Sequence, residues 1–296
     1  MLLLLSLPGI IWYVIFSYLP MSAIVLAFQR YRVHGNFFQS ITQSEFVGLA
    51  NFQILFRSGD AALIIRNTVL YNLLFIVLGI VVPMIFALAL FEMHSRFFSK
   101  LYQSLLFIPF FLSMMVISYI VFGFLDHTNG FVNSVLTSFG LDPINFYRET
   151  AWWPFILPLV NTWRGMGYNM IIFLAAMCGL DKSYYEAAMI DGANQWQKIK
   201  RITLPLLKPI LIILIILSVG NIMRADFGLF FHVPRNSGPL FPVTQVIDTF
   251  IFRGLRNLGD FSITAATGLL QSVVGLVLVI ATNAIVRKLD SDAAMF

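Results

Sequence analysis

Six polar side chains stand inside long apolar runs of the sequence: Asn161, Arg164, Asn221, Arg224, Asp226 and Gln271. If those runs cross a bilayer, a charged group at a helix centre costs about 2.5–3.5 kcal/mol on insertion scales, which makes it a candidate for function. We therefore expect the six side chains to line a polar pathway. The alternative for each is a hydrogen bond between helices or an internal ion pair, such as Asp226 with Arg164 or Arg224.

The amino-acid composition also indicates that much of the protein surface faces a lipid bilayer. Of the 296 residues, 59% are hydrophobic and 11% are charged, against about 45–50% and about 25% in soluble domains. Thirty phenylalanines are more than one core can bury, so a water-soluble globule is excluded. The single cysteine, Cys178, excludes an internal disulfide and a multi-cysteine metal site. We interpret the net charge of +5 as a matter of membrane topology, with no nucleic acid as partner.

Six apolar runs are long enough for transmembrane helices, which need about 20 residues each. A run such as Ile210–Leu217 is apolar throughout and does not alternate as a half-buried strand would. The predicted fold class is therefore all-α, an integral membrane protein of about six transmembrane helices. The predicted spans are Leu2–Phe28, Ile65–Phe91, Leu101–Leu125, Trp152–Leu180, Pro209–Phe231 and Phe261–Val286.

The loops between these spans fall into two alternating sets, which differ in basic residues. The sets are residues 92–100, 181–208 and 287–296, and residues 29–62, 126–151 and 232–260. The first set holds nine Lys and Arg, and the second holds seven although it is nearly twice as long. The positive-inside rule places the first set and the N-terminus in the cytoplasm. A signal peptide is the alternative for Leu2–Phe28, but that run lacks a charged start and a small-residue cleavage pattern.

The longest cytoplasmic loop, residues 181–208, opens with the signals of a short helix. Ser183 and Glu186 fit a capping box, which predicts a helix from Ser183 to about Ile190. Gly192 then ends it, because glycine readily adopts the left-handed conformation found after helix ends.

A second short helix is predicted in the same loop. Asn194 and Gln197 fit another capping box. Pro205 and Pro209 are expected to break the chain before the fifth span, because proline cannot donate a helix hydrogen bond. By periodicity alone, the two helices form no more than an amphipathic linker at the membrane surface.

The residue pattern of this loop is more specific than a linker. It matches E-A-A-x3-G-x9-I-x-L-P and so resembles the EAA motif of permease subunits in bacterial binding-protein-dependent ABC importers. The matched residues are Glu186, Ala187, Ala188, Gly192, Ile202, Leu204 and Pro205. In that family the first short helix sits in a cleft of the ATP-binding subunit. The resemblance implies coupling to an ATPase through Glu186, Ala187, Ala188, Asp191 and Gly192.

The resemblance continues beyond the loop. Residues 221–230, 234–240, 246–249 and 253–255 resemble the carbohydrate branch of these importers, notably the LplB-like, alginate and rhamnogalacturonan permeases. This implies a type I ABC importer (MetI-like) permease fold in the bacterial inner membrane. The implied partners are a second, different permease subunit, two ATP-binding subunits, an extracytoplasmic solute-binding protein and an oligosaccharide substrate.

The polar pathway suits such a substrate. Sugar hydroxyls need hydrogen-bonding side chains, and sugar rings stack on aromatic planes such as those of Trp163 and Phe227. Arg164 and Arg224 also suit carboxylates, as in uronate-containing oligosaccharides. The alternatives are an ABC permease for another small solute and an ion-coupled secondary transporter.

No G-x-x-x-x-G-K-[ST] phosphate loop occurs in the sequence. We therefore expect this chain not to be an enzyme and to hold no cofactor or metal, with ATP and Mg bound by the partner ATPase subunits.

The chain is expected to divide by function along its length. Residues 1–60 are assigned to the first helix and an outer loop, 61–288 to a five-helix core, and 289–296 to a cytoplasmic tail. In the outer loop 232–260, Arg235 and Arg253 are the candidates for docking the solute-binding protein.

Overall fold

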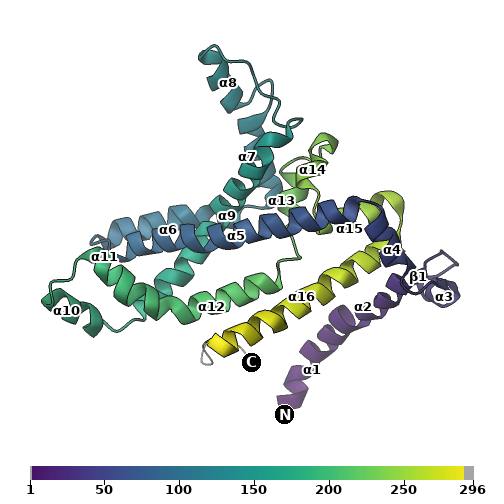
Figure 1. Cartoon of the computed structure of the whole chain (residues 1–296), viewed down its shortest axis with the longest axis horizontal. Helices are drawn as coiled ribbons and strands as arrows, with labels where there is room; N and C mark the ends of the chain where they lie inside the picture. The colour runs from purple at the N-terminus through teal and green to yellow at the C-terminus, as the bar shows by residue number, and fades with distance from the viewer. Residues whose placement is uncertain (1, 290–296) are drawn as a thin grey trace. The chain divides into compact units, whose positions relative to one another are not determined.

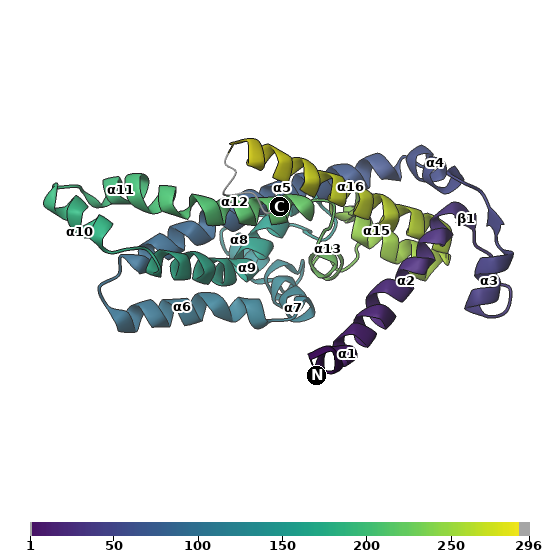
Figure 2. The same cartoon turned by 90° about the horizontal axis from the view of Figure 1, so that it is seen from below.

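The computed structural model describes residues 2–289, and nearly all of its elements are helices (Figures 1 and 2). A bilayer offers the backbone no hydrogen bonds, so apolar segments satisfy their own amides and carbonyls as helices. Within these residues the one sheet is an antiparallel ribbon of β1 (Gln29–Arg30) and β2 (Glu45–Phe46). The predicted all-α class is confirmed apart from this ribbon. The predicted tail lies outside the described residues except for Leu289.

The chain forms two compact units. The first comprises the residues up to Arg66 together with Gln245–Val274, and the second comprises Asn67–Thr244 together with the residues from Gly275 onward. Two long helices, α5 (Asp60–Phe91) and α16 (Phe261–Leu289), contribute residues to both. The division by function expected near residue 60 stays a prediction.

The first unit begins with a helical run and continues with short helices. The run is α1 (Leu2–Tyr13), a π-helical turn (Val14–Tyr18), α2 (Leu19–Met21) and a 3-10 segment (Ser22–Phe28). Asn51 anchors the end of this run, because its amide donates to the carbonyls of Ala27 and Gln29, each at 2.9 Å. The short helices are α3 (Phe37–Gln43), α4 (Ala50–Arg57) and α15 (Ile247–Arg253), the last followed by a π-helical turn (Gly254–Leu258).

The second unit holds the other helices, and α6, α12, α13 and α14 pack against α9. These are α6 (Arg96–Phe111), α7 (Met114–Leu125), α8 (Phe131–Ser138), α9 (Trp153–Cys178), α10 (Ser183–Ile190), α11 (Gln195–Lys198), α12 (Leu204–Gly220), α13 (Phe227–His232) and α14 (Phe241–Thr244). A core of buried side chains joins α5, α9 and α12 through residues such as Met84, Phe173 and Leu207. Gly167 lets α9 approach α6 closely, since a Cβ there would collide with the carbonyl of Leu106.

Four helical stretches of the described chain are long and apolar enough to cross a membrane. They are Ser6–Phe28, Asp60–Phe91, Gln195–Gly220 and Phe261–Lys288. The pair α6 and α7 makes a fifth span if the two are counted together. The remaining predicted span, α9, has 26 residues but is not among them, because Asn161, Arg164 and Asn169 interrupt its apolar surface.

Two predicted spans differ in shape from the expectation of one straight helix. The third is bent by 101° between α6 and α7, because Leu112 is extended and the Ser113 hydroxyl accepts from Val116 N to begin a new helix. The fifth ends at Gly220 rather than Phe231, and residues 221–226 form a non-helical break before α13.

Pro205 and Pro209 do not break the chain before the fifth span, so that prediction is wrong. A helix runs from Gln195 to Gly220 through Pro205 and Pro209. A π-helical turn, Ile199–Thr203, ends two residues before Pro205, which lies in the first turn of α12, where a missing N–H is tolerated.

Candidate functional site

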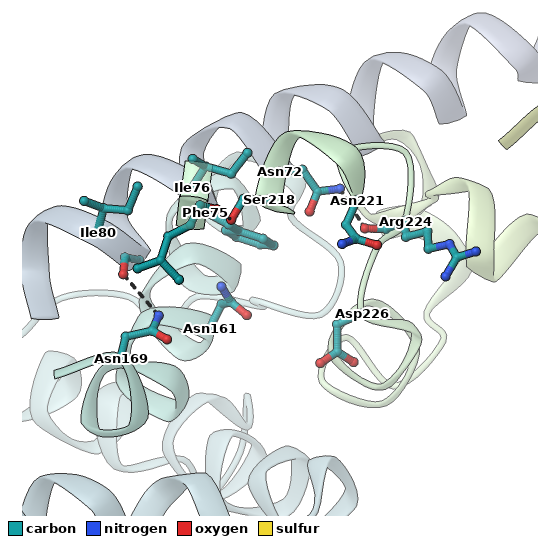
Figure 3. A pocket seen from close by; sticks show the side chains of 12 residues that line it. Asn72, Phe75, Ile76, Ile80, Asn161, Asn169, Ser218, Asn221, Arg224 and Asp226 are labelled. Atoms are coloured by element: carbon teal, nitrogen blue, oxygen red, sulfur yellow. Dashed lines mark hydrogen bonds between the residues drawn. The ribbon is translucent and has the colours of Figure 1, made fainter. Parts of the chain in front are cut away.

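A polar cavity of about 300 Å³ lies in the second unit (Figure 3). Its walls are α5, α9, the end of α12 and the break at residues 221–226. Four asparagines give it amide donors and acceptors, and Arg224 and Asp226 give it charge of both signs. The lining residues are Asn72, Phe75, Ile76, Gly79, Ile80, Asn161, Asn169, Leu214, Ser218, Asn221, Arg224 and Asp226. The volume is at the lower end of the range for small-molecule sites.

The break between α12 and α13 is stabilised by a side chain of α5. The amide of Asn72 donates to the carbonyl of Ile222 at 2.9 Å and to that of Arg224 at 3.1 Å. Asp226 then begins α13 as its N-cap, since its Oδ1 accepts from the Leu229 N–H at 3.1 Å. Irregular backbone at membrane depth is tolerated where protein or a polar cavity satisfies it, and both conditions hold at this break.

Arg164 reaches the cavity through Asp226. Its Nη1 lies 3.2 Å from Oδ2 of Asp226, and the two side chains are 29% and 38% exposed. The Nε of Arg164 is buried and has no hydrogen-bond partner among residues 2–289. The pair is thus a single-point contact between opposite charges on α9 and on the N-cap of α13.

The structure brings together most of the predicted pathway residues. Asn161, Asn221, Arg224 and Asp226 line the cavity, while Arg164 pairs with Asp226 as the ion-pair alternative proposed. Asn221 and Arg224 do not share a helix face, because both lie in the break rather than in the fifth span. In Figure 3 the Arg224 side chain points away from Asn161.

Gln271 belongs to the first unit, whereas every residue of the cavity lining belongs to the second. Its amide donates to both carboxylate oxygens of Asp248, at 3.2 and 3.3 Å. Gln271 therefore fits the alternative of a hydrogen bond between helices, here α16 and α15.

Three polar residues of the lining are not among the six predicted pathway residues: Asn72, Asn169 and Ser218. Asn72 stands in the apolar second span and Asn169 in the fourth, so both could have been found by the same criterion that selected Asn161. Ser218 gives no such signal, because its hydroxyl donates to the Leu214 carbonyl one turn back at 2.7 Å and so costs little in an apolar helix.

The predicted coupling helix forms as α10, with a different N-terminal cap. The Ser183 and Glu186 capping box is absent from α10. Instead, the Ser183 N–H donates to Oδ1 of Asp181 at 2.9 Å, and this hydrogen bond lowers the pKa of the Asp181 carboxyl. Gly192 has a φ of +74°, so it ends α10 as expected, and the Asn194 and Gln197 capping box is confirmed.

The residues predicted for ATPase coupling lie on the surface of the second unit. Glu186, Ala187, Asp191 and Gly192 are exposed and Ala188 is half-buried. In both views α10 lies beyond the ends of α6 and α9 (Figures 1 and 2).

Tyr185 ties α10 to two neighbouring helices. Its hydroxyl is 2.9 Å from the Thr203 hydroxyl, and its ring centroid is 5.9 Å from that of Phe91 at the end of α5. These contacts hold α10 against the start of the helix that runs from Gln195 to the cavity at Gly220.

The two arginines predicted for receptor docking lie in different units. Arg235 is exposed and stacks over the ring of Phe122, at 4.1 Å from its centroid. Arg253 is half-buried at the end of α15, and burial lowers the pKa of its guanidinium to about 10. It lines a second cavity of about 320 Å³ together with Asp60 and Asp260.

No group of three or more His, Cys, Asp or Glu within the described residues 2–289 could hold a metal ion. The cavity contains amides, one hydroxyl and one charge of each sign, a set that suits a hydroxylated organic solute.

Residues 79–292 match the family model described as "Binding-protein-dependent transport system inner membrane component". The chain is 33% identical over 291 residues to the polygalacturonan/rhamnogalacturonan transport system permease protein YteP of Bacillus subtilis (strain 168), covering 98% of this chain and 89% of YteP. It is 30% identical over 291 residues to Protein LplB of the same strain, covering 98% and 90%.

The fold matches a crystal structure of a bacterial ABC transporter involved in the import of the acidic polysaccharide alginate. The TM-score is 0.88 at 30% identity, covering 98% of this chain and 96% of the other. A bacterial alginate ABC transporter in complex with an alginate pentasaccharide-bound periplasmic protein matches with a TM-score of 0.87 at 30% identity, covering 97% and 94%.

Proposed function

Because the chain belongs to the family of binding-protein-dependent transport system inner membrane components, we propose that its polar cavity is part of the translocation pathway of an ATP-driven oligosaccharide importer. The chain is a permease subunit of an ABC importer in the bacterial inner membrane, and ATP is hydrolysed by separate subunits. The observation that carries the proposal is a cavity of amide and charged side chains among the helices of a permease.

The proposed contact with the ATP-binding subunit is α10. Glu186, Asp191 and Gly192 are exposed, and the small side chains of Ala187 and Ala188 leave room for a partner's groove. ATP and Mg are bound by the partner subunits in this proposal. Closure of the ATPase pair on ATP would then move α10, and hydrolysis would release it.

The path from α10 to the cavity is short and continuous. Tyr185 fixes α10 to Thr203, and the helix that contains Thr203 extends to Gly220, where the cavity-lining break begins. A displacement of α10 is therefore passed along a helical rod to Asn221, Arg224 and Asp226. This connection supports a mechanism in which the ATPases open and close the pathway.

The other proposed partners are a second permease subunit of different sequence and an extracytoplasmic solute-binding protein. The solved alginate transporter was captured in complex with its periplasmic protein, which supports such a receptor for this chain. Arg235 and Arg253 stay the proposed docking residues.

The proposed substrate is an oligosaccharide that contains uronates. YteP is a permease protein of polygalacturonan/rhamnogalacturonan transport, and the solved transporter imports the acidic polysaccharide alginate. In this chain the Asn161 amide and the side-chain oxygens of Asn72 and Asn169 are proposed to bind hydroxyls. Arg164 and Arg224 provide cations for carboxylates.

The test is reconstitution. This chain is purified with its co-purifying subunits, placed in proteoliposomes with ATP inside, and supplied outside with the solute-binding protein loaded with oligosaccharide. ATP-dependent uptake that requires the binding protein is the expected result. Uptake by this chain alone under an ion gradient would replace the proposal with a secondary transporter.

A further inference from the structure

Arg164 and Asp226 are joined by one contact, although a guanidinium and a carboxylate have the geometry for two. Oδ1 of Asp226 is held by the Leu229 N–H as the N-cap of α13, so only Oδ2 faces Arg164. The buried Nε of Arg164 meets no acceptor within residues 2–289. Asp226 therefore satisfies only part of what Arg164 can donate.

This incomplete pair meets the cavity through Asp226, because Arg164 is not itself among the lining residues. Asp226 lines the cavity itself, and roughly a third of each side chain is exposed. A part-exposed ion pair of this kind is weak, because water screens it. A second carboxylate that enters the cavity can thus replace Asp226 at small cost, and it gains by making the second hydrogen bond with Arg164.

We propose that Asp226 is a built-in substitute for a substrate carboxylate. It occupies Arg164 while the pathway is empty, and a uronate carboxylate of the passing oligosaccharide displaces it. The inference rests on the proposed function and deepens it, because it names the residue that recognises the acid and the residue that competes for it.

The arrangement explains why an acid belongs at position 226. An unpaired guanidinium in a membrane protein is costly, so the empty pathway needs a counter-charge for Arg164. Asp226 supplies that charge, and after displacement it still caps α13 through Leu229. Arg224 has a different place: its side chain is exposed and points away from Asn161 (Figure 3), so it attracts an anion without holding Asp226.

The test uses the complete assembly in proteoliposomes, with the solute-binding protein and ATP. The KM for uptake of trigalacturonate is measured for the wild type, Arg164→Gln, Asp226→Asn and the double variant. Asparagine keeps an N-cap oxygen for the Leu229 N–H but carries no charge. Because the binding protein is the same in all four measurements, its own preference cancels in the comparison.

Arg164→Gln is expected to raise the KM at least about tenfold, the loss expected for a charged hydrogen bond. Asp226→Asn is expected to lower the KM several-fold by removing the competitor. In the Arg164→Gln background the second change is expected to have no effect, since the competitor then has nothing to compete for.

Three results with the variants would overturn the inference. One is an Asp226→Asn effect that persists without Arg164, and another is a rise of the KM in Asp226→Asn. The third is an Arg164→Gln loss that is equally large for the methyl ester of trigalacturonate, which would make Arg164 structural.

If the wild type imports a neutral trisaccharide but not trigalacturonate, the inference fails and the importer function stands. If it imports neither, both fail.

Discussion

At the residue scale, some charged side chains form ion pairs within this chain and others do not. Arg164 and Asp226 pair with each other, and Arg30 pairs with Glu45 on the surface. Glu186 is exposed and forms no ion pair with any residue in the described range. Its charge is therefore not used in an ion pair within these residues and is available to a partner.

Reversing the charge of Glu186 tests that role. Glu186→Lys is expected to leave folding and insertion unchanged, because the side chain is exposed, but to lower transport-coupled ATPase at least about tenfold through loss of a charged contact. The measurement is ATPase activity of the reconstituted assembly with loaded binding protein. Lys182→Glu, at the exposed start of the same loop, is the matched control. Wild-type activity in Glu186→Lys would refute the assignment of α10.

Tyr147 leads to a prediction about alkaline pH. Burial, partly offset by Arg235 and reinforced by Asp126, raises the pKa of Tyr147 to about 12, against about 10 for an unfolded tyrosine. Folding thus favours the neutral phenol, so its contribution to stability is complete below about pH 10 and is lost as the pH rises toward 12. Its hydroxyl has no hydrogen-bond partner among the described residues.

Tyr147→Phe should therefore keep or raise the melting temperature at pH 7 and should reduce its decline between pH 10 and 12. Melting curves of the purified chain in detergent measure both effects. Tyr184→Phe, an exposed tyrosine, serves as the control. A decline in Tyr147→Phe as steep as in the wild type would show that this phenol does not cause it.

Residue identity alone predicted much of the cavity, because a polar side chain in an apolar run is costly wherever it lies. That criterion found Asn161, Arg224 and Asp226 without knowledge of the fold. It also selected Gln271, whose amide binds Asp248. Whether two side chains on different helices pair depends on how the helices pack, and residue spacing along the sequence does not predict that packing.

At the element scale, the helices were predictable from apolar length, but their breaks were not. The break after Gly220 contains no proline, and it exists because Asn72 on another helix satisfies its carbonyls. Pro205 and Pro209 lie in a helix that continues through both. The local signals that were present are the N-cap residues that begin the next helix, Ser113 before α7 and Asp226 before α13.

The close crossing of α6 and α9 gives a test at this scale. Gly167→Ala is expected to destabilise the protein by about 1–3 kcal/mol, because the added Cβ collides with the backbone of Leu106 and Phe107. Gly165→Ala is the matched control on the same helix, since nothing lies within 4 Å of a Cβ there. Thermal unfolding in the same detergent compares the two, and equal melting temperatures would contradict the described crossing.

At the scale of the whole molecule, the positive-inside rule predicts which ends face the cytoplasm. Ile190 on α10 is 87% exposed and Phe139 in the opposite loop set is 78% exposed. With Cys178→Ser as background, Phe139→Cys should react with a membrane-impermeant maleimide on intact spheroplasts, whereas Ile190→Cys should react only after lysis. The reverse pattern would invert the topology and place α10 away from any cytoplasmic ATPase.

The polar character of α9 also has a consequence for biosynthesis. A helix that carries Arg164 and two asparagines partitions poorly from the translocon into lipid by itself. Two of its partners are synthesised before it: Asn169 donates to the Gly79 carbonyl of α5 at 3.1 Å, and Gly167 packs on α6. Asp226, the partner of Arg164, follows it in the chain. Entry of α9 into the bilayer thus depends on earlier helices that wait beside the translocon, which makes the order of translation a condition for building the pathway.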